Sequence, residues 1–377
     1  MPSLTRAPRL RAALALGASV ALIGAGAATA LTSGATASAA TRAKAAAPAV
    51  KHVFVINLEN KGYDETFGPD SPAPYLSKTL TSKGQLLTQY YGTAHNSLPN
   101  YIAQVSGQGP DPQTQGDCQV YSDFVQTGTV DPQQAVGDGC VYPSTVKTVA
   151  DQLEAKGLTW KGYMEDMGTS CRHPAPNTQD DTQQAEVGDQ YAARHNPFVY
   201  FKSLLDSGSC DRNDVDLSQL PTDLASASTT ANLTYITPNL CNDGHDSPCV
   251  DGRPGGLVSA DEWLKTWVPK ILASPAFNND GLLVVTFDEA ESDSPDGAAA
   301  CCGEGPGPNA PLPGIYGMGG GRTGAVLLSP FIKPGTWNNT AYNHYSLLRS
   351  IEDTFGLAPL GYANDARGFG YDVWGAA

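Results

Sequence analysis

Five short, continuously hydrophobic runs recur along the chain, at residues 52–58, 160–164, 233–237, 282–287 and 325–329. Uninterrupted runs of this length are typical of strands buried on both faces, as in a parallel sheet covered by helices. Candidate helices lie between or after them, at 74–83, 99–106, 146–156, 260–272 and 345–355. This alternation predicts an α/β fold with a mostly parallel central sheet flanked by helices. Because no linker interrupts it, we expect a single domain over residues 51–377.

The first 50 residues do not follow this pattern. Arg6, Arg9 and Arg11 precede an uncharged stretch rich in Ala, Leu and Gly, and Ala37-Ser38-Ala39 has the form of a cleavage site. These features predict a Sec-type signal peptide over residues 1–39, followed by an Ala-rich tether over 40–50. A transmembrane anchor is the alternative, but Ala and Gly make the stretch only weakly hydrophobic. We therefore expect a secreted protein with no stable membrane anchor after cleavage.

Charge and cysteine content narrow the class of protein further. The formal net charge of −15 argues against a nucleic-acid partner, because phosphate contacts need clustered Lys and Arg. The eight cysteines of an exported chain indicate disulfides. Proximity in the sequence suggests the pairs Cys118–Cys140, Cys171–Cys210 and Cys241–Cys249, whereas the adjacent Cys301 and Cys302 either bridge each other or pair elsewhere.

Acids and amides follow three of the predicted strands directly. Glu59 and Asn60 end the first run, and Asp288 and Glu289 follow the run 282–287. The run 233–237 is followed by Asn239, Asn242, Asp243, His245 and Asp246. Ligands bind at the carboxyl ends of strands in open α/β sheets, and carboxylates gathered there repel each other unless a cation lies among them. We therefore predict a metal site, with ordinary polar turns as the plainer alternative.

Ser97 stands where a helix is expected to begin, because Pro99 suits a first helical turn. A helix N-terminus favours anions, so a serine there is placed to attack the phosphorus of an anionic ester. The alternative is that Ser97 is only the N-cap of this helix, and the sequence leaves both interpretations open. The motifs G-x-S-x-G, G-x-x-x-x-G-K-[ST] and H-E-x-x-H are absent from residues 51–377, which argues against the corresponding hydrolase, nucleotide-binding and zinc-protease sites.

Four of these segments together resemble the bacterial and fungal phosphoesterase family, which includes secreted acid phosphatases and phospholipases C within the alkaline-phosphatase superfamily. They are Glu59-Asn60-x-x-Tyr63, His95-x-Ser97-x-Pro99-Asn100-Tyr101, Pro238-Asn239-x-x-Asn242-Asp243-x-His245-Asp246 and Thr286-x-Asp288-Glu289. The resemblance covers almost all of residues 51–377. It implies an alkaline-phosphatase-like fold and hydrolysis of phosphate esters, with phosphatidylinositol 3-phosphate among the substrates it suggests.

Carried over residue by residue, the resemblance implies that Ser97 is a nucleophile that forms a phosphoserine. The implied metal ligands are Glu59, Asn60, Asp243, Asp288 and Glu289. The implied phosphate-binding residues are Asn60, Asn239, Asp246 and His344. His95 or His245 would protonate the leaving oxygen, because histidine titrates near the working pH range.

Histidine is too scarce for an imidazole-rich metal centre. Alkaline phosphatases have Asp-His where this chain has Asp288-Glu289, and the whole chain holds six histidines. Oxygen ligands favour Mg, Ca, Mn or iron, which makes zinc the weaker prediction. His173 and His195 are interpreted as structural, although the run Arg194-His195-Asn196-Pro197 fits the family pattern.

The sequence thus predicts a secreted, metal-dependent phosphomonoesterase that acts on a small-molecule or lipid phosphate ester. A phospholipase C-type phosphodiesterase is the first alternative, because the same chemistry serves both reactions. The acidic chain and the lack of a basic amphipathic segment favour the monoesterase. An exported, non-catalytic metal-binding protein is the second alternative, since acids at strand ends would serve it equally well.

Overall fold

The computed structural model describes residues 49–375, which belong to one compact unit of the chain. The predicted signal peptide and nearly all of the predicted tether lie outside the described residues.

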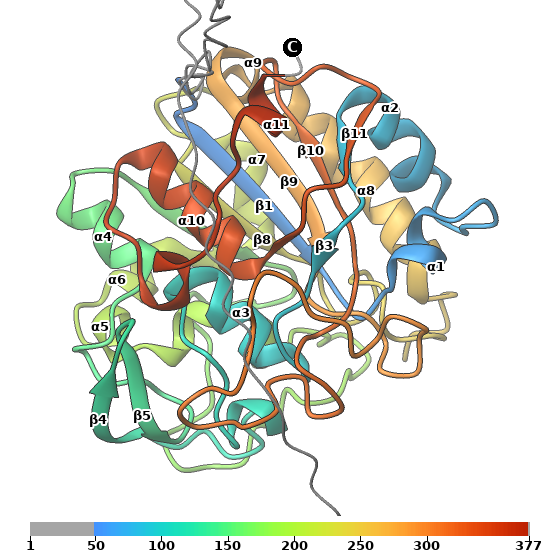
Figure 1. Cartoon of the computed structure of the whole chain (residues 1–377). Helices are drawn as coiled ribbons and strands as arrows, with labels where there is room; N and C mark the ends of the chain where they lie inside the picture. Colours follow the sequence, from blue (N-terminus) through green and yellow to red (C-terminus); the bar gives the residue numbers. More distant parts are fainter. Residues whose placement is uncertain (1–48, 376–377) are drawn as a thin grey trace, which may run out of the picture. The chain divides into compact units, whose positions relative to one another are not determined.

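An eight-stranded sheet runs through this unit, in the order β11-β2-β10-β9-β1-β8-β6-β7 (Figure 1). Its central strand β1 (His52–Leu58) is parallel to both neighbours, β8 (Leu233–Thr237) and β9 (Gly281–Phe287). Val53 lies opposite Leu233 on one side and Leu282 on the other. The sheet continues in parallel through β6 (Trp160–Met164) to β7 (Asp214–Asp216). The mostly parallel sheet predicted from the hydrophobic runs is therefore confirmed.

One central strand runs the other way. β10 (Ala325–Leu328) is antiparallel to β9 and to β2 (Gln85–Leu87), and β11 (Thr336–Asn338) pairs with β2 in parallel. The connection from β9 to β10 contains no crossover helix and returns to the same end of the sheet, so the chain must run back antiparallel. Burial on both faces depends on the helical layers and not on strand direction, which is why the hydrophobic run of β10 did not reveal this reversal.

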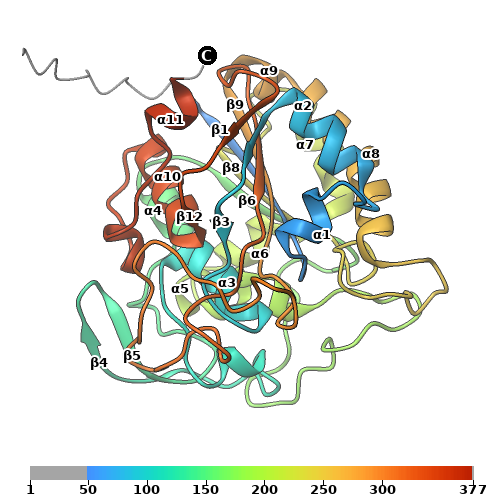
Figure 2. The same ribbon diagram turned by 45° about the vertical axis from the view of Figure 1, so that its right-hand side comes forward.

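Helices cover both faces of the sheet, and the side chains of β1 show it directly. Val53 and Val55 belong to the hydrophobic cluster under α3 (Ser97–Ser106), α4 (Val149–Ala155) and α10 (His344–Phe355). Phe54 and Ile56 belong to the cluster under α8 (Gly256–Ala273) and α9 (Pro275–Asp280). Figure 2 shows α10 and α4 on one side of the sheet and α8, α7 (Leu220–Asp223) and α2 (Thr81–Lys83) on the other.

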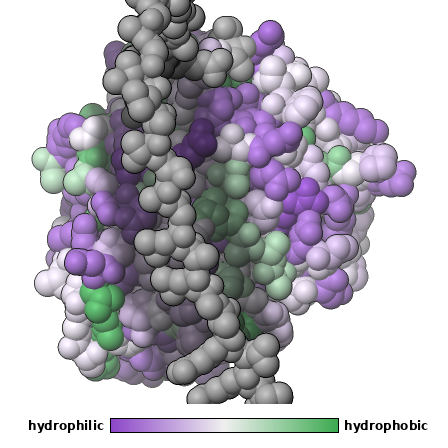
Figure 3. Space-filling view, in the orientation of Figure 1, coloured by the Kyte–Doolittle hydropathy of each residue, from purple (hydrophilic) through white to green (hydrophobic). Residues whose placement is uncertain are grey.

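Smaller elements complete the unit. They are α1 (Tyr63–Phe67), a π-helical segment Tyr75–Leu80, α5 (Lys202–Leu205), α6 (Ser209–Asn213), α11 (Tyr371–Trp374) and two small sheets, β3 (Tyr90–Tyr91) with β12 (Tyr342–Asn343) and β4 (Val125–Val130) with β5 (Gln134–Asp138). The β4–β5 hairpin carries a hydrophobic patch on a largely polar face (Figure 3), where the side chain of Val125 is 67% exposed.

All eight cysteines form disulfides. The bridges are Cys118–Cys140, Cys171–Cys210, Cys241–Cys249 and the vicinal pair Cys301–Cys302. Three of them are the pairs suggested by proximity in the sequence. Within residues 49–375, no helix has the length and hydrophobicity needed to span a membrane.

Candidate active site

The carboxyl ends of β1, β8 and β9 meet at one edge of the sheet, and each delivers a buried carboxylate. Glu59 follows β1, Asp243 lies in the loop after β8, and Asp288 follows β9; all three are fully buried. Backbone contacts fix them together, because the Glu59 N–H donates to the Asp243 carbonyl at 2.9 Å and the Asn60 N–H donates to the Asp288 Oδ1 at 3.0 Å. Residues 184 positions apart along the chain, such as Glu59 and Asp243, thus share one site.

A histidine completes this cluster. The Nε2 of His195 lies 3.2 Å from the Glu59 Oε1, and its Nδ1 lies 3.7 Å from the Asp243 Oδ2. The ring stacks on Tyr101, with ring centroids 5.2 Å apart and planes 9° apart. Glu59, His195 and Asp243 each offer one ligand atom, and these atoms all lie within 4.8 Å of one another.

Several oxygens of the cluster have no hydrogen-bond donor. They are the Oδ1 of Asn60, the Oδ2 of Asp243 and the Oδ2 of Asp288, all of them buried. Buried polar atoms in proteins nearly always have a partner, so each of these calls for one. A divalent cation coordinated by carboxylate, amide and imidazole atoms would satisfy them together. The residues present therefore fit a metal ion.

Electrostatics supports the same conclusion. Burial raises the pKa of both Asp243 and Asp288 well above the usual range, and the nearby Glu59 carboxylate raises each of them further. Burial also lowers the pKa of His195, which favours the neutral imidazole that metals bind. A cation within the cluster would let the carboxyl groups ionise together.

Ser97 is the first residue of α3, and the preceding Asn96 occupies the N-cap position. The Ser97 hydroxyl is buried and donates a hydrogen bond to the Glu59 Oε2 at 2.9 Å. It is therefore not used as a cap, which removes the plainer of the two interpretations offered by the sequence. Its Oγ lies beside the carboxylate cluster, at the positive end of a ten-residue helix.

Asn100 braces the segment that leads into Ser97. Its side-chain oxygen accepts from the N–H groups of Thr93 and Ala94 at 2.8 and 3.0 Å, and its side-chain nitrogen donates to the carbonyls of Ala94 and Asn96, both at 2.9 Å. The amide is fully buried. One side chain thus fixes the backbone around the serine.

His95 pairs with Glu289 beside the cluster. Its Nδ1 contacts the Glu289 carboxylate, and its Nε2 donates to the Gly297 carbonyl at 2.7 Å. Burial opposes the charged form, but the contacts with Glu289 and Gly297 hold the pKa of His95 above its usual value. Burial raises the pKa of Glu289 to about 8. Both ring nitrogens of His95 are therefore engaged in contacts with the protein.

These groups open onto a cavity of about 450 Å³. Its lining includes Asn60, Ser97, His95 and Glu289, together with Asp117 and Arg194. His245 lies at its edge, with 44% of its side chain exposed. Most of the lining is polar, as a phosphate site requires, and the buried Arg194 guanidinium is the one strong cation among the described residues that line it.

Three of the predicted phosphate-binding residues are placed elsewhere. The Asn239 amide nitrogen donates to the Asp166 carboxylate at 2.6 Å, and its oxygen accepts from the N–H of Asn242 at 3.0 Å. Asp246 does not line the cavity. His344 is fully buried between the Tyr90 hydroxyl and the Asp288 carbonyl. The structure therefore gives Asn239 and His344 supporting positions behind the site.

Sequence reasoning missed several residues of the site. His195, interpreted as structural, belongs to the carboxylate cluster, and Tyr101 donates to the Glu59 Oε1 at 3.1 Å. Asp117 accepts from the Leu98 N–H at 2.9 Å, and burial raises its pKa to about 6. The run from Arg194 to Pro197 carried a signal, since it fitted the family pattern. Asp117, beside a disulfide cysteine in a long loop, carried none.

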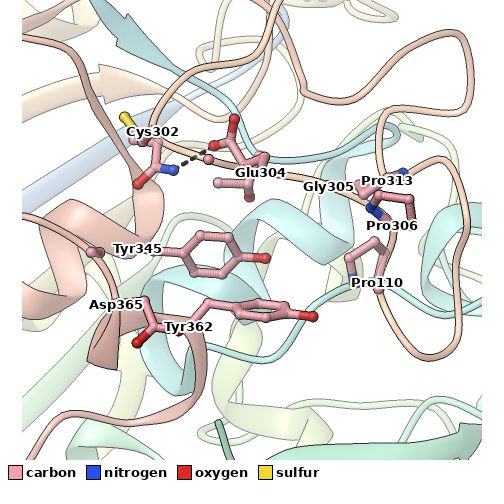
Figure 4. Close-up of a pocket in the computed structure, with 14 residues that line it drawn as sticks. Pro110, Cys302, Glu304, Gly305, Pro306, Pro313, Tyr345, Tyr362 and Asp365 are labelled. Atoms are coloured by element: carbon pink, nitrogen blue, oxygen red, sulfur yellow. Dashed lines mark hydrogen bonds between the residues drawn. The ribbon is translucent and has the colours of Figure 1, made fainter. Parts of the chain in front are cut away.

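A second cavity, of about 220 Å³, is lined by Tyr345, Tyr362, Glu304 and three prolines (Figure 4). The rings of Tyr345 and Tyr362 meet edge to face at 5.2 Å. None of the predicted site residues lines it, so the cavity at Ser97 is the candidate active site.

Curated relatives share this region of the chain. An acid phosphatase of Aspergillus fumigatus is 29% identical over 321 residues, 83% of this chain and 56% of that protein. A phosphate-repressible acid phosphatase of Penicillium chrysogenum is 28% identical over 84% of this chain and 65% of its own length. This chain therefore spans less than two thirds of either fungal protein. A phosphatidylinositol-3-phosphatase of Mycobacterium tuberculosis is 26% identical over 88% of this chain and 85% of that protein.

Among solved structures, a protein of the alkaline phosphatase superfamily from Vibrio parahaemolyticus is similar, with a TM-score of 0.49 and 12% identity over 84% of this chain and 69% of that one. The model of the phosphoesterase family matches residues 70–358, which include Ser97, His195, Asp243 and Asp288. The chain therefore belongs to the phosphoesterase family.

Proposed function

We propose that this protein is a secreted, metal-dependent phosphomonoesterase that uses Ser97 as its nucleophile. The observation that carries the proposal is the Ser97 hydroxyl, which is buried at the start of α3 and donates to Glu59 within the carboxylate cluster. The family and the relatives named as acid phosphatases support phosphomonoester hydrolysis. The mycobacterial relative extends the candidate substrates to phosphoinositides.

Glu59, Asn60, Asp243, Asp288 and His195 would hold one divalent cation. Four of these five residues offer oxygen, which favours Mg, Ca, Mn or iron over zinc. When bound, such a cation supplies positive charge that offsets the carboxylates and polarises phosphoryl oxygens. Glu289 was expected as a ligand, but its carboxylate pairs with His95. We therefore place it beside the metal site and not among the ligands.

The residues of the chain account for both halves of the reaction. The Ser97 Oγ attacks phosphorus, and its proton passes to the Glu59 carboxylate that already accepts its hydrogen bond. As the bond from phosphorus to the alcohol oxygen breaks, His245 protonates that oxygen. Water then attacks the phosphoserine and gives a proton to His245, phosphate leaves, and the Ser97 oxygen takes back the proton held by Glu59. The Arg194 guanidinium is placed to bind phosphoryl oxygens throughout.

The test is hydrolysis of p-nitrophenyl phosphate before and after chelation, with add-back of each of the four cations. We expect activity to disappear with the cation and to return with at least one of them. Bis(p-nitrophenyl) phosphate distinguishes the diesterase, and faster cleavage of the diester would overturn the monoesterase. An exported binding protein without catalytic function would bind the cation and hydrolyse neither substrate.

Export is part of the proposal. Four disulfides, none of them leaving a free cysteine, suit an oxidising compartment. Mass spectrometry of the protein recovered from a culture medium would test it, and an N-terminus near residue 40 is the expected result. Retention of the intact chain in cells would contradict it.

A further inference from the structure

Tyr316 stands apart from the other residues that line the cavity at Ser97. Nearly all of the described lining residues are polar or charged, and only Ala290 and Tyr316 are not. Of these two, only Tyr316 offers a flat, apolar ring. The residue is 68% exposed, so its ring lines the cavity without being buried in the protein core.

The ring lies beside the predicted reaction centre. It meets the imidazole of His95 at a centroid distance of 6.2 Å and an angle of 62°, and His95 is two residues from Ser97. A phosphate group bound at Ser97 would direct its alcohol portion outward, because the leaving oxygen departs on the side opposite the attacking serine. The alcohol would therefore occupy the mouth of the cavity, where Tyr316 lies.

Hydrogen bonds to its backbone hold the loop that carries Tyr316. The side-chain nitrogen of Gln115 donates to the carbonyls of Leu312 and Pro313 at 2.8 and 2.9 Å, and the His95 N–H donates to the Pro313 carbonyl at 3.2 Å. On the other side, the Gly320 N–H donates to the Gly92 carbonyl at 2.9 Å. Both ends of the loop are thus attached to the segment that leads to Ser97. Because these attachments already order the loop, less conformational entropy is lost when the Tyr316 ring contacts a ligand.

We infer that Tyr316 is a specificity-determining residue, whose ring packs against the alcohol portion of the phosphate ester and selects esters of aromatic or other flat apolar alcohols. The inference rests on the proposed function, because it assigns the alcohol side of the same site. Aromatic packing of this kind contributes about 0.5–1.5 kcal/mol, which corresponds to a two- to tenfold change in affinity.

Steady-state kinetics on two monoesters tests it, with 2-naphthyl phosphate as the flat aromatic ester and glycerol 3-phosphate as the polyol ester. In Tyr316→Ala we expect KM for naphthyl phosphate to rise about five- to tenfold, with kcat within about twofold and the constants for glycerol 3-phosphate unchanged. Tyr316→Phe keeps the ring and should behave like the parent protein. Met318→Ala is the matched control, since Met318 is exposed on the same loop but does not line the cavity.

The other outcomes separate the two levels of the proposal. Equal changes for both esters in Tyr316→Ala, a loss in Tyr316→Phe as large as in Tyr316→Ala, or the same selective loss in Met318→Ala would each overturn the role of the ring. Hydrolysis of neither ester by the parent protein would overturn the proposed function, and with it this inference. Because Tyr316 is exposed, an unchanged Tm is expected in every variant.

Discussion

At the scale of single residues, the site depends on which polar atoms are already satisfied and which are not. The Asn100 amide makes four hydrogen bonds to the backbone and accepts a fifth from the Thr93 hydroxyl, whereas the buried Oδ2 atoms of Asp243 and Asp288 have no donor. Ser97 lies between these two environments, with a fixed backbone and a hydroxyl directed at Glu59. This difference separates residues that build the site from residues that act in it.

Replacement of Ser97 should remove catalysis without removing the site. In Ser97→Ala we expect hydrolysis of p-nitrophenyl phosphate to fall by about a thousandfold or more, because the substitution removes the hydroxyl that donates to Glu59 within the cluster. Cation content, measured by elemental analysis, should stay the same. Ser106→Ala is the matched control, since this buried serine of the same helix donates to the Ile102 carbonyl and accepts from the Gln108 N–H, with no bond to the carboxylate cluster. Retained activity in Ser97→Ala would rule out the nucleophile assignment.

His195 provides a second test among the histidines. We expect His195→Ala to weaken cation binding by about ten- to a hundredfold, because its ring lies between Glu59 and Asp243. His173, from the same long loop, contacts the Pro174 carbonyl and stacks on Tyr121 instead. Isothermal titration with Mn²⁺ should therefore give the parent affinity for His173→Ala. Equal affinities in the two variants would remove His195 from the metal site.

At the scale of elements, the site is a property of strand ends held in register. Glu165, directly after β6, accepts hydrogen bonds from the Asn239 N–H at 2.9 Å and from the Asn242 side chain at 3.0 Å. These two residues form the turn that follows β8 and leads into Asp243. One strand thus fixes the loop of its neighbour, and the loop presents the carboxylate.

Weakening the hydrogen bonds between Glu165 and this turn should lower the affinity of the site for its cation, although Glu165 is not a proposed ligand. We expect Glu165→Gln to lower the free energy of unfolding by about 1–3 kcal/mol and to weaken cation binding by about tenfold. Glu154→Gln is the control at the opposite end of β6, where Glu154 accepts from the Trp160 indole at 2.9 Å. That variant should lose stability in thermal unfolding while its cation affinity stays unchanged. An unaltered affinity in Glu165→Gln would show that the turn holds its shape without the hydrogen bonds to the Glu165 carboxylate.

The central strands were predictable from sequence because each is a continuous hydrophobic run that ends at a polar residue. β1, β6 and β8 have the predicted bounds. β7 was not predicted, since an edge strand with the sequence Asp-Val-Asp carries no such pattern. Helix α4 begins at Val149 and not at 146, because Thr148 and Asp151 form a capping box that the periodicity did not reveal. Local sequence patterns thus predicted the layers of the fold but not its short polar elements.

The candidate site was predictable to the same extent. Glu59, Asp243 and Asp288 follow strands, so the fold class alone brings them to one edge. His195 arrives on a long loop whose path depends on tertiary contacts, among them the bond from Asn196 to Asp214 at 2.7 Å and the Cys171–Cys210 bridge nearby. No periodicity in the sequence encodes that path.

At the scale of the whole molecule, acids outside the carboxylate cluster are buried as well. Burial raises the pKa of Glu352 on α10 to about 8, of Glu304 to about 8 and of Asp214 to about 7. The folded protein therefore keeps protons that the unfolded chain releases near the ordinary carboxyl values. Stability that depends on these protons is complete at acidic pH and is lost as the pH rises through the folded values.

We therefore expect the free energy of unfolding to be higher at pH 5 than at pH 8. Glu352→Gln should flatten this dependence by up to about 1.4 kcal/mol per pH unit between the ordinary value of 4.5 and about 8, which is the slope for one proton. The glutamine keeps an acceptor for the Leu360 N–H, which donates to Glu352 at 2.8 Å. Urea unfolding across this pH range measures the slope. Glu262→Gln, on an exposed acid of α8, should leave it unchanged, and an identical slope in Glu352→Gln would contradict the explanation.

The position of β1 in the middle of the sheet has a consequence for the order of events during synthesis. β1 is the first strand of the sheet in the chain, but its two partners are residues 233–236 and 281–287. Both partners are therefore synthesised long after β1 itself. Contacts of such long range form slowly, because a large loop must close before they contribute. We therefore expect the core of the sheet to form only after about three quarters of the chain has been synthesised. For the export proposed above, the strand order itself would delay folding until most of the chain has been synthesised.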